Sequence, residues 1–338
     1  MIWLGWRQLR TQAATLYAAV AVCAVVAVIT GSALPRSGPD VFDLLTPGDR
    51  RLYFTGVIVM ALAPALVGAF LGAPMVAREL ESGTHGLAWN QSVTRTRWLA
   101  TKLVLSAAAV AVAVGALSLA VTWWAAPLDG ASSSTRGSLP GRLTPVSFAM
   151  RGLAPVGYAV FALLLGVAIG ILLRRSVPAI AVTLAVFTFV QIAMPLWVRP
   201  HLLRPTTQLV SVSADTIAGI GFHNEDPVPT LEVQSPPGAW VLSDRTVDAA
   251  GRVVPVPSSF VECVPRPPRP DQPDGPGVVN IRERMDTCLS QLAAAGYRQR
   301  LVYQPAGRFW PLQWAETGVF LALSGLLAWF CFWRVRRL

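Results

Sequence analysis

Three charged residues, Arg78, Glu79 and Glu81, directly follow a membrane-like apolar run, in the stretch VARELESGTHGLAWNQSVTRTRWLATK at residues 76–102. An acidic or basic side chain at the centre of a membrane helix costs about 2.5 to 3.5 kcal/mol, whereas a leucine is favourable by about half a kcal/mol. These charges therefore have to lie outside the hydrocarbon. With bases such as Lys102 at the far end of the stretch, they offer ion pairs and hydrogen bonds to another protein surface.

The middle of this stretch has the residues of a short capped helix. Gly83 and Thr84 predict a turn followed by an N-cap, with a helix over residues 85–90. Ser92 or Thr94 is suited to cap the next apolar run. We expect a short helix held between two turns, with acids before it and bases after it.

Metal binding and nucleophilic catalysis have weaker candidates. The sequence HNED at residues 223–226 holds three metal-ligand side-chain types, but Pro227 and Pro229 surround its end, and a polar turn is the favoured interpretation. Ser258 and Ser259 lack the strand-turn-helix context of a nucleophile elbow. We expect no metal site and no enzyme active site in this chain.

The position of the single lysine limits how the chain could obtain energy for transport. A P-loop needs a lysine within G-x-x-x-x-G-K-[ST] to reach the phosphates of ATP. Lys102 is the only lysine, and it follows Thr101. The chain therefore cannot hydrolyse ATP by that route, so a transporter of this sequence would take its energy from a partner or from an ion gradient.

Glu316 is the one acid that interrupts an apolar run, close to the outer end of the last one. One interpretation is structural: Glu316 reaches the membrane interface or caps a neighbouring backbone group. The other is a gating or substrate role, because ionisable residues inside membrane helices often mark transport pathways. A single acid makes a proton relay a poor explanation.

The elements that position these residues are long apolar runs. The chain has 338 residues, of which 53% are hydrophobic and 14% charged, and its mean hydropathy is +0.50; this is too apolar for an ordinary soluble domain. A helix of about 20 residues crosses a hydrocarbon layer of about 30 Å. We predict six transmembrane helices, at about 12–34, 52–77, 103–128, 152–173, 176–198 and 311–333.

Arginine and lysine near the helix ends set the predicted orientation, because they resist translocation. The side that holds the N-terminus carries the larger set: Arg7, Arg10, Arg78, Arg95, Arg97, Lys102, Arg174, Arg175, Arg334, Arg336 and Arg337. The short opposite loops carry Arg36, Arg50, Arg51, Arg136, Arg142 and Arg151. We expect a multi-pass protein of the plasma membrane with residues 1–10 as a cytoplasmic elbow and 334–338 as a cytoplasmic tail. The net charge of +10 then reflects topology and contact with the lipid bilayer, and not nucleic-acid binding.

Residues 199–310 form one long extracytoplasmic segment in this topology. A helix is predicted over residues 280–295, and short strands are predicted at 239–244, 252–257 and 299–304, with a loop at 265–277. We therefore expect a small mixed α/β domain. Cys263 and Cys288 are the only cysteines on this oxidising side, and we predict that they form a disulfide.

Small residues within the apolar runs predict close helix packing. Gly68-x-x-x-Gly72 and Gly166-x-x-x-Gly170 would let helices approach each other. Packing inside one subunit is favoured over a specific seam between two subunits. Cys23 and Cys331 lie within membrane helices, where small apolar packing residues are the default interpretation.

The pattern Arg78-Glu79-x-Glu81-x-Gly83-Thr84, followed by Arg97-Trp98 and Lys102, resembles the cytoplasmic loop of ABC-2 type transporter permeases. The fuller string GTHGLAWNQSVTRTRWLATK is similar to those of the actinobacterial ABC exporter membrane subunits. The opening WRQLRTQ at residues 6–12 and the string YQPAGRFWPLQWAETG at residues 303–318 are similar to the same group.

This resemblance implies an all-α polytopic membrane protein with six transmembrane helices, of the ABC-2 or type V exporter kind. It implies pairing with a second permease subunit, as a homodimer or heterodimer, and a separate ABC ATPase subunit that holds ATP and Mg, with no cofactor in this chain. A coupling helix within the loop 78–102 would meet that ATPase. The positions carried over are Arg78, Glu79, Glu81, Gly83 and Thr84 in the coupling element, and Arg97 and Lys102 on its far flank.

The expected function is outward transport of a hydrophobic or amphipathic substrate. Two other functions stay open at this point. An ion-coupled secondary transporter would use Glu316, and a membrane-anchored sensor or binding protein would use the extracytoplasmic segment.

Overall fold

The computed structural model describes residues 2–32, 46–83, 94–131, 141–223, 226–257, 260 and 281–337. Within them the chain divides into two units. Unit 1 is helical and comprises Met1–Leu203 and Gly307–Leu338, and unit 2 comprises Arg204–Ala306. The division falls close to the predicted limits of the extracytoplasmic segment, residues 199–310.

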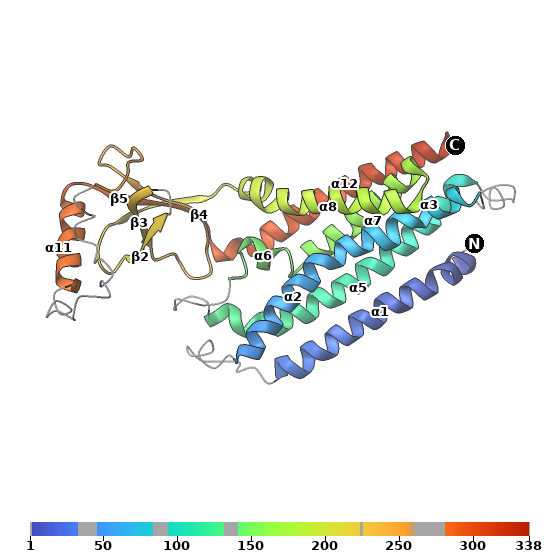
Figure 1. Cartoon of the computed structure of the whole chain (residues 1–338), viewed down its shortest axis with the longest axis horizontal. Helices are drawn as coiled ribbons and strands as arrows, with labels where there is room; N and C mark the ends of the chain where they lie inside the picture. The colour runs from blue at the N-terminus through green and yellow to red at the C-terminus, as the bar shows by residue number, and fades with distance from the viewer. Residues whose placement is uncertain are drawn as a thin grey trace, which may run out of the picture. The chain divides into compact units, whose positions relative to one another are not determined.

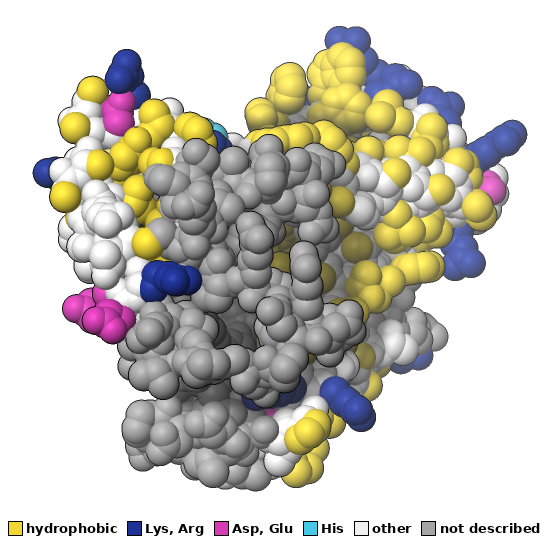
Figure 2. Space-filling view, turned by 60° about the vertical axis from the view of Figure 1, so that its left-hand side comes forward, with side chains coloured by type: hydrophobic (Ala, Val, Ile, Leu, Met, Phe, Trp, Pro, Cys, Tyr) yellow, Lys and Arg dark blue, Asp and Glu magenta, His cyan; other side chains and the backbone are white. Residues whose placement is uncertain are grey.

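Unit 1 is built from long helices. Among the described residues, six helices are long and apolar enough to cross a membrane, as the sequence predicts. Hydrophobic side chains cover much of their exposed surface (Figure 2), which suits contact with lipid. The helical elements are α1 (Ile2–Ser32), α2 (Pro47–Leu66), the π-helix η1 (Val67–Gly72), α3 (Ala73–Glu81), α5 (Arg95–Ala131), α6 (Pro145–Phe148), α7 (Ala154–Leu173), α8 (Ser176–Ala193), the π-helix η2 (Met194–Val198), α9 (Arg199–Leu202), the 3-10 turn η4 (Ala306–Arg308) and α12 (Phe309–Arg336).

The helix bounds differ from the predicted spans in a consistent way, because several helices continue beyond their apolar runs. Elements α2, η1 and α3 follow one another without a break and carry the second span to Glu81. α1 is one helix from Ile2, with no break at residue 10, where the elbow was predicted to end. α12 extends past both ends of the predicted 311–333. Hydropathy marks the hydrocarbon, whereas backbone hydrogen bonds continue into the interface.

α7 lies at the centre of unit 1 and is the most deeply buried span. It packs against α12, η1, α3, α8 and α5, while α1 packs along α5. Figure 1 shows the N- and C-termini at the same end of the bundle, beside the end of α3. We call this the loop end, and we call the end that carries Leu203 and Gly307 the distal end.

Glycines let the second span approach α7 very closely. A methyl group on Gly166 would lie 2.2 Å from the carbonyl oxygen of Gly68, and one on Gly170 would lie 2.5 Å from that of Ala73. A methyl group on Gly72 would lie 2.4 Å from a backbone oxygen of α7. Both glycine motifs therefore serve packing inside one subunit, as predicted.

Unit 2 is a mixed α/β structure. Strands β1 (Thr206–Ser211), β5 (Arg298–Gln304) and β4 (Trp240–Val247) form an antiparallel sheet in that order, and β2 (Ile217–His223) pairs with β3 (Asp226–Val233). Helix α11 (Ile281–Ala294) contributes to a small core. The fully buried members of that core are Val212, Leu231, Val256, Phe260, Leu289 and Leu292.

The predictions for unit 2 have mixed outcomes. The helix, Gly296 just past its end, and the strands at 239–244 and 299–304 are confirmed by α11, β4 and β5. The strand predicted at 252–257 is wrong: only an isolated bridge from Val253 to Val247 forms there. Its two prolines cannot donate ladder hydrogen bonds, which limits pairing.

Several predictions for unit 2 fall on residues outside the described part. The loop at 265–277 and the N-cap Asn280 belong to this group. So does Cys263, whereas Cys288 lies on α11 and packs beside the small core. The disulfide between Cys263 and Cys288 therefore stays a prediction.

Asp244 links the two sheets of unit 2. Its Oδ2 atom accepts a hydrogen bond of 2.8 Å from the backbone N–H of Val233, at the end of β3. Its buried Oδ1 atom has no hydrogen-bond partner among the described residues. Burial raises the pKa of the Asp244 carboxyl above its usual range; the bond from Val233 opposes this, and the nearby Glu232 adds to it.

The contact between Gly166 and Gly68 yields a stability prediction. Gly166→Ala should destabilise the protein by about 1 to 3 kcal/mol, because the backbones must separate. Gly318→Ala on α12 is the matched control, since a methyl group there meets nothing within 4 Å. That control should gain up to about 1 kcal/mol from helix propensity. Thermal unfolding of the full chain in detergent measures both changes, and equal effects at the two sites would contradict the packing argument.

The raised pKa of Asp244 predicts a pH effect with a definite sign. Because the folded carboxyl holds its proton to higher pH than the unfolded one, its ionised form penalises the fold, and stability falls as pH rises through the folded pKa. Asp244→Asn keeps an acceptor for Val233 and removes the charge. The variant should melt above the wild type at neutral pH, and this difference should shrink as the pH is lowered toward 3.8, the ordinary pKa of an aspartic acid side chain. A constant difference across that range would contradict the assignment.

Candidate functional site

The loop end of unit 1 brings together residues that lie on both sides of the loop between α3 and α5. Lys102 on α5 donates a hydrogen bond from Nζ to Oε1 of Glu79 on α3 and forms an ion pair with it. The Lys102 side chain is 10% exposed and that of Glu79 is 24% exposed. The Lys102 ammonium also lies 4.6 Å from the ring centre of Trp98. A partly buried ion pair with a cation–π contact therefore fastens one loop flank to the other.

Glu81 connects the same loop flank to a third helix. Its Oε2 atom accepts hydrogen bonds from the backbone N–H of Ser176 at 3.0 Å and from the Ser176 hydroxyl at 2.9 Å. Ser176 is the first residue of α8, whose own N-cap position, Arg175, makes no side-chain cap. A carboxylate at a helix N-terminus satisfies a free N–H and is favoured by the helix dipole. Glu81 thus caps α8 from outside.

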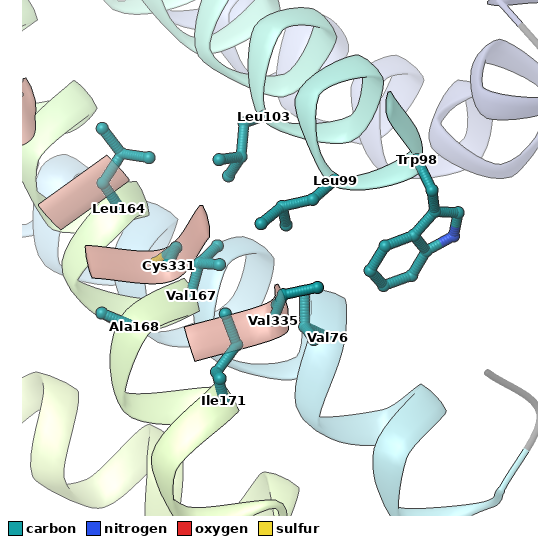
Figure 3. Close-up of a cluster of buried hydrophobic side chains, with 10 residues drawn as sticks. All are labelled: Val76, Trp98, Leu99, Leu103, Leu164, Val167, Ala168, Ile171, Cys331 and Val335. Carbon is teal, nitrogen blue, oxygen red and sulfur yellow. The ribbon is translucent and has the colours of Figure 1, made fainter. Parts of the chain in front are cut away.

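A cluster of buried apolar side chains lies beside these polar contacts and joins four helices. Figure 3 shows that Val76 of α3, Leu99 of α5, Ile171 of α7 and Val335 of α12 meet in one group. Cys331 is fully buried in it, as its predicted packing role requires. The remaining members are Trp98, Leu103, Leu164, Val167 and Ala168. Burial of this cluster holds both loop flanks on one common core.

The other predicted coupling residues remain at the surface. Arg78 and Arg97 are exposed, so their charges are accessible from outside the bundle. Gly83 has φ +72, a conformation that favours glycine, and it turns the chain out of α3. Thr94 accepts a hydrogen bond from the N–H of Arg97, which confirms it as a cap for α5. Thr84 and the predicted helix at 85–90 lie outside the described residues.

This arrangement can transmit force. The loop flanks cannot move separately from α5 and α8 without breaking an ion pair or a helix cap. No reaction chemistry is expected from these residues, and among the described residues no group of three His, Cys, Asp or Glu side chains is placed to hold a metal ion.

The distal end of unit 1 holds a second charged site. Arg199 at the start of α9 donates from Nε to Glu316 Oε2 at 2.7 Å and from Nη2 to Glu316 Oε1 at 2.9 Å. Both side chains are completely buried. The hydroxyl of Tyr158 on α7 donates to Glu316 Oε1 at 2.8 Å, and Arg199 Nη1 donates to the Pro145 carbonyl of α6 at 3.0 Å. The guanidinium also lies 4.3 Å from the ring centre of Phe148.

The expectation that Glu316 reaches the membrane interface or caps a backbone group is wrong. Glu316 is fully buried and forms a bidentate ion pair, because the apolar surroundings force its charge to find a partner inside the bundle. The gating role of Glu316 stays a prediction.

Two residues at this end were missed by sequence reasoning. Arg199 was assigned to the extracytoplasmic segment, although an arginine that directly follows an apolar run, with a single acid in another run, is a signal for a buried pair. Gln313 on α12 accepts hydrogen bonds from the N–H groups of Leu153 and Ala154 and donates to the Phe148 carbonyl. It thereby provides a hydrogen-bond acceptor for free N–H groups at the N-terminus of α7.

The buried pair gives a testable prediction. Arg199→Met or Glu316→Met alone should each cost about 3 to 5 kcal/mol, because the remaining charge is buried without a partner. The double variant should recover most of that loss, since it buries no charge. Denaturant unfolding of the full chain measures the free energy of unfolding of the wild type, the two single variants and the double variant, which together form a double-mutant cycle.

Arg252→Met is the control for this cycle, because the Arg252 side chain is 79% exposed in its pair with Asp248 and should change stability little. Additive effects of Arg199→Met and Glu316→Met on the free energy of unfolding would contradict a coupled pair.

Comparison with known proteins agrees with the helical unit. The family model for "ABC-2 membrane transporter related" proteins matches residues 8–199, more than half of the chain, which includes the first four spans, most of the fifth, and the loop between α3 and α5. No curated protein and no solved structure matches the chain. Together with the six apolar helices, the family match identifies a multi-pass membrane protein that forms the membrane subunit of a transporter. The chain belongs to the ABC-2 membrane transporter related family.

Proposed function

We propose that this chain is the permease subunit of an ATP-driven exporter that moves a hydrophobic or amphipathic substrate outward. A separate ABC ATPase subunit binds ATP and Mg and contacts the loop between α3 and α5. A second permease subunit completes the route across the membrane. The family match over residues 8–199 supports a transporter membrane subunit, and the loop end supports the rest.

The observation that carries this proposal is the way the loop is anchored. Glu79 binds Lys102 across the loop, and Glu81 binds Ser176 at the start of α8. A push on the loop therefore moves the second, third and fifth spans together. A loop that only connected two helices would not need contacts of this kind.

The distribution of charge supports a cytoplasmic position for the loop end. Arg78, Arg95 and Arg97 flank the loop, Arg174 and Arg175 form the turn between α7 and α8, and α12 ends in basic residues. Cationic helix ends are retained in the cytoplasm. Unit 2 then lies outside, because its ends connect to the distal end.

The same contacts suggest how the motion spreads. When ATP binding draws the ATPase subunits together, the displaced loop carries α3 with it, and the glycine contacts pass the displacement to α7. The π-helix η1 and Pro64 interrupt regular α-helical geometry between α3 and α2. Such interruptions are where helices bend, so the distal part of the second span can follow a different path and open the route.

An ion-coupled mechanism has less support from the described residues. The carboxylate of Glu316 is held by Arg199 and Tyr158, so it is engaged in structure and not poised to carry a proton. This favours a partner ATPase as the energy source.

The anchoring of the loop yields a prediction for the complex with its ATPase. Glu79→Ala should lower substrate-stimulated ATP hydrolysis by about tenfold, because it leaves the Lys102 ammonium buried without its partner, at a cost of order 1 to 3 kcal/mol. Glu79→Ala with Lys102→Ala should recover part of the loss. Removing the acceptor of the α8 cap with Glu81→Ala should act in the same direction.

One control and one surface variant make this experiment specific. Glu283→Ala removes an exposed acid of α11 and should leave hydrolysis unchanged. Arg78→Glu with Arg97→Glu reverses two exposed charges and should weaken copurification of the ATPase without lowering the melting temperature. Full stimulation in Glu79→Ala and Glu81→Ala, together with full ATPase binding in the Arg78→Glu/Arg97→Glu variant, would overturn the coupling assignment.

A further inference from the structure

A pocket opens in the distal half of unit 1, between α1, α2 and α5. It encloses about 170 Å³. α1 packs along α5, whereas α2 packs mainly against α7 and α8, so α1 and α2 form two walls with α5 as the floor between them. Figure 1 shows these three helices running side by side. The helix contacts described above leave this space unfilled by protein.

The wall formed by α1 is firmly held. Trp124 on α5 donates a hydrogen bond from Nε1 to the Thr30 hydroxyl at 3.1 Å, and Tyr17 donates to the Ala109 carbonyl at 3.1 Å. A methyl group on Gly31 would lie 2.8 Å from Trp123 and from Trp124, so α1 docks closely at its distal end. These contacts keep the pocket open as a feature of the folded bundle.

The lining of the pocket is apolar along its length and polar at one end. The apolar part includes Val22, Val26, Val59, Met60 and Leu117. Thr55 of α2 is the other hydroxyl in the lining, and Tyr53, Ser147 and Arg151 form the polar end.

These polar residues hold one another in place. The hydroxyls of Tyr53 and Ser147 lie 2.7 Å apart, and the Arg151 guanidinium lies 5.8 Å from the centre of the Tyr53 ring. Arg151 Nη1 donates to Asp129 Oδ1 at 2.6 Å. A guanidinium has five N–H donors, and the Arg151 side chain lines the pocket with 4% of its surface exposed.

The depth of the pocket matches one leaflet of a bilayer. The lining residues run from Leu52 to Met60 on α2 and from Leu117 to Ala125 on α5, so at 1.5 Å per residue the pocket is about 12 Å long. Half of a hydrocarbon layer of about 30 Å is about 15 Å. Arg151 lies three residues before the start of α7 and so at the level of that helix end, where lipid head groups are found.

We propose that this pocket binds one phospholipid of the leaflet that borders the distal end, with an acyl chain between α1 and α2 and its phosphate at Arg151. The apolar walls recognise the chain, and the guanidinium recognises the phosphate, because arginine can bind phosphate with two parallel hydrogen bonds. This site is separate from the proposed export function and does not depend on it. A lipid seated there would replace a missing helix contact between α1 and α2.

Gly56 provides a specific way to fill the pocket. It lines the pocket on α2, and a methyl group placed on it would meet nothing within 4 Å. Gly56→Trp should therefore occupy the chain site without disturbing the helix packing, and Gly56→Leu is a smaller second variant. Gly325→Trp on α12 is the matched control, because Gly325 is also unobstructed and does not line the pocket.

The experiment uses the full chain in vesicles of phosphatidylcholine and phosphatidylglycerol that contain a trace of phosphatidylglycerol with a photoreactive diazirine in its acyl chain. After illumination, the labelled peptides are mapped by mass spectrometry. Adducts should concentrate on residues 22–27 and 55–60, and Gly56→Trp and Gly56→Leu should remove most of them. Gly325→Trp should leave them unchanged.

A second arm tests the head group, with a diazirine diacylglycerol that lacks the phosphate. It should label the pocket about tenfold less than the phospholipid, as expected when a charge-assisted hydrogen bond is lost.

Three results would overturn the proposal. Labelling of residues 22–27 and 55–60 that is no denser than on the exposed face of α8, or that persists in both Gly56 variants, excludes a defined chain site. Equal labelling by the two lipids excludes the role of Arg151. Labelling by a diazirine alkyl phosphate added from water, without labelling by the vesicle phospholipid, assigns the pocket to another amphiphile.

Discussion

A charged group in a hydrocarbon environment needs its partner inside the protein, and this constraint organises the distal end of the bundle. Arg199 and Glu316 neutralise each other through two parallel hydrogen bonds, and the Tyr158 hydroxyl donates a further hydrogen bond to the Glu316 carboxylate. Because a buried ion pair adds little net stability compared with apolar residues of the same size, we interpret its value as specificity. It allows one arrangement of α9, α12 and α7, since any other would bury a lone charge.

The loop end also uses paired charges, but these charges are less deeply buried. There the charges lie at the membrane boundary and are only partly buried, and an apolar cluster of four helices carries most of the packing. The Glu79–Lys102 pair and the Glu81 cap make that packing specific, because they connect particular helix ends. α7 takes part in both ends and is bound to the second span by glycine contacts between them. The bundle is therefore stiff along α7. The π-helix η1, which interrupts the second span, packs against this stiff helix.

The sequence predicts the spans well and their contacts poorly, for a physical reason. A run of about 20 apolar residues has few stable alternatives to a membrane helix, so six spans follow from local composition. The Arg199–Glu316 pair joins residues that are 117 positions apart, and no local pattern specifies such a partner. In unit 2, β4 and β5 follow alternating apolar residues, whereas the glycines of β2 and the prolines of β3 weaken the strand signal.

The buried pair also explains how this permease can carry a long segment between its fifth and sixth spans. Unit 2 comprises Arg204–Ala306, so it begins just after Arg199 and ends just before Glu316. The ends of an inserted segment are then fixed by a contact that belongs to the bundle. Closing a longer loop between two fixed points adds only about 0.6 kcal/mol for each doubling of its length. The bundle therefore does not depend on the size of the segment between the two partners.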